Sequence, residues 1–281
     1  MEKKILVTGA TGLVGKELVS KIVKAGHYAY TCSRNKNADS PVPVISSEEL
    51  LDGKLPKVDV VVNCAFARSN QATELCAALD FTTQLIKVLE HTDVDGVINV
   101  SSQGVYKRLP AGELAKESSP VEPVDLYSMA KYATEKLFEA STLKNYTNVR
   151  LSSINMKQRF LARFVECVKN GEPIHLNSPQ QYASLLDVED AATGLLALAI
   201  IDPAQWMPVY NLGIGQQYTL LEYAELVKQI GASFGYTPEI EVSDNGICTT
   251  AGMDISRIAK DCGWRPAINN EMMIKKLFGE N

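Results

Sequence analysis

Short runs of consecutive apolar residues alternate along this chain with longer segments in which apolar residues recur every three or four positions. Uninterrupted apolar runs are typical of parallel strands buried on both faces, and the three- or four-residue period is typical of helices that cover them. Six runs predict strands, at residues 3–8, 28–33, 41–45, 58–65, 97–100 and 147–152. The alternation predicts an α/β fold with a doubly wound, mostly parallel sheet.

The helical period is clearest at residues 71–90 and from 126 to about 141, where Asp125 is placed to cap the second helix. Residues 191–201 form the longest apolar stretch, which Thr193 and Gly194 interrupt. That stretch is shorter than the ~20 residues that cross a bilayer. We therefore predict a buried helix there and no membrane association.

Composition narrows the class of protein. The chain has 281 residues, 46% of them hydrophobic, and a formal net charge of -5, which argues against nucleic-acid binding because that needs a basic surface. The six cysteines form no CxxC pair and the three histidines are scattered, so we expect reduced thiols, no metal site and a cytoplasmic protein. The apolar run after the N-terminus is too short for a signal peptide.

A glycine-rich turn joins the first strand to an amphipathic helix with the spacing GxxGxxG, from Gly9 to Gly15. Strand, glycine turn and helix in this order are the context of a Rossmann-type dinucleotide site. Glycine lets the backbone approach a pyrophosphate, and the helix N-terminus offers free N–H groups to it. The predicted cofactor-binding residues of the turn are Gly9, Thr11, Gly12, Leu13, Val14 and Gly15.

The ends of two later strands predict the rest of the cofactor site. The second strand ends at Ser33 and Arg34, and no carboxylate follows until Asp39. A carboxylate there would bind the ribose 2′-hydroxyl of NAD, whereas an arginine can pair with the 2′-phosphate of NADP. We therefore favour NADP, with NAD as the alternative. Small or apolar residues at the end of the fourth strand are expected to lie under the cofactor: Cys64, Ala65 and Ala67.

The candidate chemistry lies between residues 97 and 131. The strand 97–100 runs into Ser101 and Ser102, and Tyr127 and Lys131 are four residues apart at the start of a helix. Residues at this spacing share one helix face, and an ammonium beside a phenol favours the phenolate. The tyrosine could then act as an acid or base, with a serine hydroxyl as a second hydrogen-bond partner of the reacting oxygen.

Together these motifs resemble the extended short-chain dehydrogenase/reductases, the NAD(P)-dependent epimerase/dehydratase family. The resemblance covers almost the whole chain: GxxGxxG, the S-x-x-V-Y segment at 102–106, YxxxK at 127–131, a seventh strand at 209–213 and the closing Gly263-Trp264-Arg265-Pro266 turn. It implies a sheet of about seven strands. Residues 1–152 plus about 184–212 would bind NAD(P), and about 153–183 plus 213–281 would form a small α/β substrate lobe.

The resemblance also implies roles for the residues of the site. Tyr127 would exchange a proton with the substrate oxygen, Lys131 would hold the nicotinamide ribose, and Ser102 would orient the oxygen. Ser101 is expected at the cofactor and Tyr106 near the substrate. The helices at 71–90 and 126–141 would form a homodimer interface.

The substrate is the least determined part of the prediction. Nucleotide-sugar enzymes of this family often carry Arg-Asp where this chain has Ala183-Ser184, and 4,6-dehydratases carry Asp-Glu where it has Gln103-Gly104. Arg159 and Arg163 could meet an anionic substrate or could form a solvated helix face. We expect hydride transfer at the hydroxyl or carbonyl of a sugar, as in a nucleotide-sugar epimerase or ketoreductase. The alternatives are an NADPH-dependent reductase of a smaller carbonyl compound and a non-catalytic NADP sensor.

Overall fold

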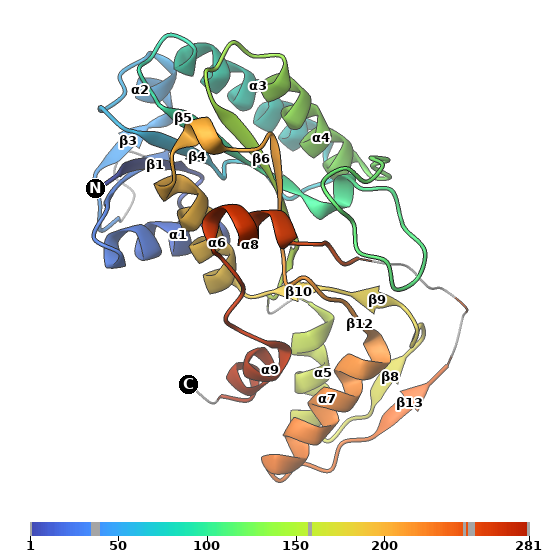
Figure 1. Ribbon diagram of the computed structural model, residues 1–281. Coiled ribbons are helices and arrows are strands. Elements are labelled where there is room, and N and C mark those ends of the chain that lie inside the picture. The colour runs from blue at the N-terminus through green and yellow to red at the C-terminus, as the bar shows by residue number, and fades with distance from the viewer. Residues whose placement is uncertain (1, 35–39, 157–158, 244–245, 247–250, 280–281) are drawn as a thin grey trace.

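The computed structural model describes residues 2–34, 40–156, 159–243, 246 and 251–279. Its centre is a sheet of seven parallel strands in the order β11-β6-β5-β4-β1-β2-β3 (Figure 1). This arrangement confirms the predicted Rossmann-type α/β fold. The strands are β1 (Lys4–Thr8), β2 (Tyr28–Ser33), β3 (Val44–Ser46), β4 (Val60–Asn63), β5 (Gly96–Ser102), β6 (Tyr146–Leu151) and β11 (Val209–Leu212).

The third and fourth strands are shorter than predicted. The third begins at Val44, three residues later than expected from the apolar run, because Pro41 and Pro43 have no N–H to donate to a ladder. The fourth ends at Asn63, so Cys64, Ala65 and Ala67 lie in the loop that follows it. The backbone at this end of the sheet is thereby free to line a cavity.

Helices cover both faces of the sheet. One face carries α1 (Leu13–Lys24), α6 (Val188–Ile200) and α8 (Ser256–Cys262), and the other carries α2 (Ser47–Leu51), α3 (Ala72–Leu89) and α4 (Leu126–Glu139) (Figure 1). Successive residues of one strand enter different cores: Ile5 and Val7 pack with α1 and α6, whereas Leu6 packs with α3 and α4. Burial on both faces explains why the strands are continuous apolar runs.

A second, smaller group of elements contains α5 (Phe160–Asn170), α7 (Leu220–Ser233) and α9 (Asn270–Phe278), with their own hydrophobic cluster. Its strand pairs are β8 (Ile174–Leu176) with β13 (Ile240–Val242), and β9 (Tyr182–Ala183) with β12 (Tyr218–Thr219). The pair β7 (Ser153–Ile154) and β10 (Leu185–Leu186) lies where the two groups meet. The short 3-10 helices are η1 (Gln103–Val105) and η2 (Pro203–Gln205).

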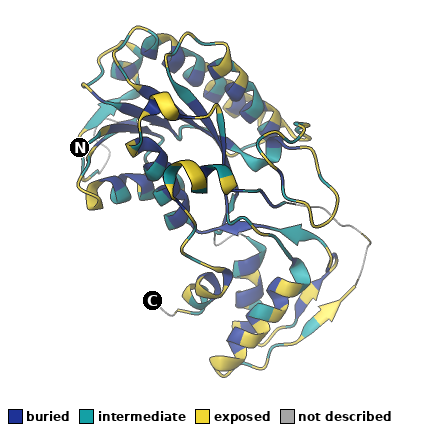
Figure 2. Ribbon diagram, viewed as in Figure 1, coloured by how far each residue is buried: buried dark blue, intermediate teal, exposed yellow. Residues whose placement is uncertain are grey.

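The C-terminal segment returns to the large domain before it completes the lobe. Ile255, Ile258 and Trp264 pack in the cluster around α1 and α6, and only α9 rejoins the lobe. Figure 2 shows buried strands through the centre of the large domain and exposed residues on the outer faces of its helices. No helix within the described ranges is long and apolar enough to cross a membrane.

Candidate active site

The glycine turn after β1 packs directly against the loop after β4. Gly9 has a positive φ of 65°, and a Cβ there would lie 2.7 Å from the backbone nitrogen of Ala65. A Cβ on Gly15 would collide with the carbonyl oxygen of Gly9. Both positions therefore require glycine, one for its φ and its packing and the other for its packing alone.

Gly12 has a different role, because it borders open space. It lines two cavities, of about 490 and 800 Å³, and a Cβ there would meet only the Gly9 carbonyl oxygen, at 3.2 Å. It is also the N-cap of α1, where no side chain caps the helix and no acidic residue lies in the first turn. The first N–H groups of α1 and its positive dipole end thus suit the pyrophosphate of a dinucleotide.

The larger cavity gathers the residues predicted for the adenosine end of the cofactor. Ser33 and Arg34, from the end of β2, line it together with Gly9, Thr11, Cys64, Ala65 and Ala67. Arg34 is exposed, and Ser47 at the start of α2 closes the same cavity. Asp39, the first carboxylate after β2, lies outside the described residues. A dinucleotide fits this pair of cavities, with Gly12 at their junction.

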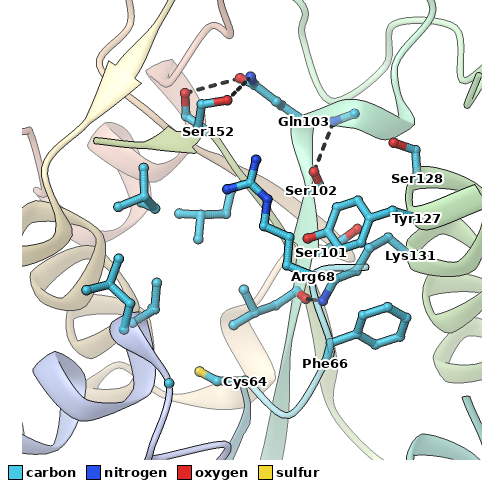
Figure 3. A pocket seen from close by; sticks show the side chains of 18 of the residues that line it. Cys64, Phe66, Arg68, Ser101, Ser102, Gln103, Tyr127, Ser128, Lys131 and Ser152 are labelled. Carbon is cyan, nitrogen blue, oxygen red and sulfur yellow. Dashed lines mark hydrogen bonds between the residues drawn. The ribbon is translucent and has the colours of Figure 1, made fainter. Parts of the chain in front are cut away.

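The smaller cavity, of about 490 Å³, brings Ser102, Tyr127 and Lys131 together (Figure 3). It also contains Leu13, Val14 and Ser101. Ser102 ends β5, and its Oγ accepts a hydrogen bond from the Gly104 N–H at 3.1 Å. Tyr127 is in the first turn of α4, whose N-cap Asp125 accepts from the Ser128 N–H at 2.8 Å, as the sequence predicts.

The loop after β4 fixes Tyr127 from the opposite side. The Asn70 Oδ1 accepts from the Tyr127 backbone N–H at 3.1 Å, and the Phe66 ring meets the Tyr127 ring edge-on with 6.1 Å between centroids. Burial raises the pKa of Tyr127, while Arg68, the Ser102 hydroxyl and Arg159 act to lower it. Among these groups the largest lowering effect comes from Arg68, whereas the sequence pointed to Lys131, whose influence on this pKa stays a prediction.

Lys131 is buried under the cavity, 5% exposed, and its Nζ donates to the Val100 carbonyl at 2.7 Å. The Nζ also lies 4.1 Å from the centroid of the Phe66 ring. Burial lowers the pKa of Lys131 to about 7, against a smaller opposing effect of Cys64. Within the described residues the Nζ makes this one hydrogen bond, and Lys131 lines the cavity.

The structure separates the two neighbouring serines. The Ser101 Oγ donates to Glu135 Oε1 at 2.5 Å, and the same carboxylate forms a buried two-bond pair with Arg150, at 3.0 and 2.7 Å. Ser101 therefore ties β5 to α4 and β6 with its side chain. The Ser102 hydroxyl, in contrast, hydrogen-bonds Tyr127 and lowers its pKa.

The candidate substrate residues differ in where they lie. The Tyr106 hydroxyl donates to Asn211 Oδ1 at 2.6 Å, and its ring packs on Arg150 and lines a separate cavity. Arg159 lines the Tyr127 cavity, whereas Arg163 is exposed and absent from its lining. Sequence reasoning missed Phe66 and Arg68, which also line it. Their position just after a strand end was the available signal.

Curated relatives match the chain at low identity over nearly its full length. A putative UDP-glucose 4-epimerase from Methanocaldococcus jannaschii is 23% identical, over 97% of this chain and 96% of the relative. Several solved structures share the fold of the present chain. A UDP-N-acetylglucosamine 4-epimerase from Bacillus cereus superposes with a TM-score of 0.85 at 20% identity, over 98% of each chain.

A UDP-glucuronic acid 4-epimerase from Bacillus cereus, in complex with UDP-glucuronic acid and NAD, superposes with a TM-score of 0.78 at 17% identity, over 99% of this chain and 98% of that one. The model of the NAD dependent epimerase/dehydratase family matches residues 5–213, which contain the glycine turn and the Ser102, Tyr127 and Lys131 cluster. The chain therefore belongs to the NAD dependent epimerase/dehydratase family.

Proposed function

We propose that this protein transfers hydride at a hydroxyl or carbonyl group of a nucleotide-sugar, as an NAD(P)-dependent epimerase or ketoreductase. One observation carries the proposal: Ser102, Tyr127 and Lys131 line the same cavity. That cavity meets the larger, cofactor-sized cavity at Gly12 of the glycine turn. Relatives and neighbouring structures with UDP-sugars in their names support the substrate class.

Each side chain has a role in this proposal. The bound nicotinamide supplies or accepts the hydride. Tyr127, whose pKa lies above that of an ordinary phenol, is protonated at neutral pH and can donate its proton to a carbonyl oxygen. For the reverse reaction it must lose that proton, and Arg68, Arg159 and Ser102 favour the phenolate. Lys131 is placed to hold the nicotinamide ribose with its remaining N–H groups.

The decisive variant removes only the phenolic hydroxyl. We expect Tyr127→Phe to bind the cofactor as the wild type does and to lose turnover by about 10²–10⁴-fold, because general acid–base catalysis contributes that much. Turnover is measured by cofactor absorbance and product chromatography with UDP-glucose, UDP-N-acetylglucosamine and UDP-glucuronic acid. Tyr132→Phe, on the same helix but outside the cavity, is the matched control. Unchanged turnover in Tyr127→Phe would contradict the mechanism.

NADP is the cofactor we propose, on the basis of Arg34 at the edge of the larger cavity. A guanidinium can pair with a 2′-phosphate through two hydrogen bonds, and a carboxylate repels that phosphate. Arg34→Asp should weaken NADPH binding by at least about tenfold while NADH binding stays the same or improves. Lys54→Asp, an exposed charge change after α2, is the control. A wild type that binds NADH more tightly than NADPH contradicts this part of the proposal.

A homodimer through α3 and α4 is the third part of the proposal. These helices pack together on one face of the sheet, and α4 exposes Leu126 and Met129 in its first turns. The charged residues exposed on α4 are Lys136 and Glu139, at its far end. The apolar start of α4 is suited to contact with a second copy of the chain, and α3 adds exposed charged residues, Glu74, Asp80 and Lys87, beside it.

A further inference from the structure

Two arginines from different parts of the fold meet beside Tyr127. Arg68 belongs to the loop after β4 in the large domain, and Arg159 is the N-cap of α5 in the smaller lobe. Both line the cavity that contains Ser102 and Tyr127, and Figure 3 shows the Arg68 side chain inside it. Arg68 lowers the pKa of Arg159, and each arginine lowers the pKa of Tyr127. The two guanidinium groups therefore line one cavity with the phenol and lie within electrostatic reach of it and of one another.

Neither guanidinium has a carboxylate partner among the described residues. The Nε of Arg159 is buried without any hydrogen-bond partner there. Arg150, in contrast, makes a two-bond pair with Glu135. Asp125 is the carboxylate in the cavity lining, and its Oδ1 already caps α4. A buried polar group without a partner is costly, so Arg159 is suited to receive a ligand, and Arg68 lines the same cavity without a carboxylate partner among the described residues.

The ligand they suit is an anion. Two guanidinium groups that repel each other are stabilised when an anion lies between them, and a carboxylate matches the two-donor geometry of each. The N-terminus of α5, directly after Arg159, adds its positive dipole end. The anion would lie beside Tyr127, which holds the reacting oxygen. In a sugar joined to a nucleotide at its first carbon and reacting at its fourth, the diphosphate is at the opposite end of the ring.

We propose that Arg68 and Arg159 bind a carboxylate that the substrate carries next to its reacting carbon, so that the substrate is a sugar acid rather than a neutral sugar. This inference rests on the proposed function. It assigns specificity to two residues that contact the substrate without taking part in the proton transfer.

The test compares two ligands that differ only at this group. UDP-glucuronic acid and UDP-glucose are titrated into the cofactor-loaded protein by calorimetry. We expect the wild type to bind the acid at least about tenfold more tightly than the neutral sugar, the value of one charge-assisted hydrogen bond. Arg68→Gln and Arg159→Gln should each weaken UDP-glucuronic acid by about tenfold to a hundredfold and change UDP-glucose by less than about threefold.

Other outcomes would overturn the inference in distinct ways. Equal losses for both sugars would assign the arginines to the diphosphate, and a loss of cofactor affinity would assign them to the cofactor. A wild type without preference for the acid would also overturn it. Arg163→Gln, one turn further along α5 and exposed, should match the wild type throughout.

A second measurement does not depend on the nucleotide. Phenylglyoxal modification of Arg68 and Arg159 is followed by mass spectrometry with D-glucuronate or D-glucose present. Protection of both arginines by D-glucuronate alone supports the carboxylate site, and absence of protection overturns it. Arg163 should be modified equally with either sugar. If neither UDP-sugar binds but D-glucuronate protects, the proposed nucleotide-sugar function fails while the carboxylate site stands.

Discussion

Burial gives Lys131 a pKa of about 7, compared with 10.5 for an exposed lysine. Below pH 7 both the folded and the unfolded chain carry this proton, and the full cost of burying the charge is present. Between about 7 and 10.5 the unfolded chain binds more protons, so the contribution of Lys131 makes the free energy of unfolding rise with pH. Above that window both states are neutral at this residue and the cost is gone.

Lys131→Met should therefore stabilise the cofactor-free protein at pH 7, by about 1–4 kcal/mol, the usual gain when a buried charge is replaced by an apolar group. The gain should shrink as the pH approaches 10. Thermal unfolding of both proteins across this pH range measures it, and Lys136→Met, exposed on the same helix, serves as control. A variant less stable than the wild type at pH 7 would show that the Val100 hydrogen bond outweighs the burial of the charge.

Arg68 controls the second titration in the cavity. It is the foremost of the groups that lower the pKa of Tyr127, ahead of Ser102 and Arg159. Removing its charge in Arg68→Gln should raise that pKa, so the acidic limb of the rate–pH profile for substrate oxidation should move to higher pH. Arg159→Gln should move the limb in the same direction by less. Steady-state rates with saturating substrate measure the shift, and a limb that stays in place would refute the electrostatic role of Arg68.

At the scale of elements, the turn between β1 and α1 depends on its contact with the loop after β4. Gly9 and Gly26 both have positive φ, 65° and 80°. A Cβ would lie 2.7 Å from the Ala65 nitrogen at Gly9, but would have open space around it at Gly26. Gly26→Ala should cost about 1 kcal/mol through backbone strain alone. Gly9→Ala should cost clearly more and abolish cofactor binding, because two backbone segments must separate.

Urea unfolding and cofactor titration of the two variants separate strain from collision. Equal losses in the free energy of unfolding for Gly9→Ala and Gly26→Ala would mean that the contact with the Cys64–Ala65 backbone does not stabilise the turn between β1 and α1.

Local patterns in the sequence predict most of these elements, and non-local contacts explain what they miss. The apolar runs predict the sheet because each strand is buried on both faces, and Asp125 predicts the start of α4 because capping is local. The Gly9–Gly15 and Tyr127–Lys131 motifs are also predictable, because their residues are only a few positions apart in the sequence. The Glu135–Arg150 pair and the placement of Arg68 beside Arg159 arise from folding of distant segments. The pKa of Tyr127 depends on burial, which spacing does not reveal.

A row of polar residues within the sheet is a second feature that depends on non-local contacts and could not be predicted from the sequence. Thr8, Asn63, Asn99 and Asn148 are register partners on four neighbouring strands, and all are buried. Thr8 donates to Asn63 at 2.7 Å, and Asn99 donates to Asn148 at 2.8 Å. Each residue alone looks like an isolated polar position within or at the end of an apolar strand. Only the pairing of the strands makes them a continuous hydrogen-bonded row that fixes the register beneath the site.

At the scale of the whole molecule, the surface of α3 and α4 bears on the assembly. Met129 is 48% exposed near the start of α4, between the buried Ser128 and Ala130. In the proposed homodimer its side chain would be buried against the partner. Met129→Glu would then place two unpaired carboxylates in one interface, which costs several kcal/mol, and should raise the dimer dissociation constant at least about a hundredfold. Sedimentation velocity over a concentration series measures this dissociation constant.

The control variant is Met272→Glu, at a residue that is 43% exposed on α9, and it should leave the dimer intact. A wild type that sediments as a monomer, or a Met129→Glu dimer of unchanged stability, would rule out this surface. Tyr127 and Lys131 lie at the start of the same helix. Breaking the dimer at α4 should therefore also lower the affinity for the cofactor.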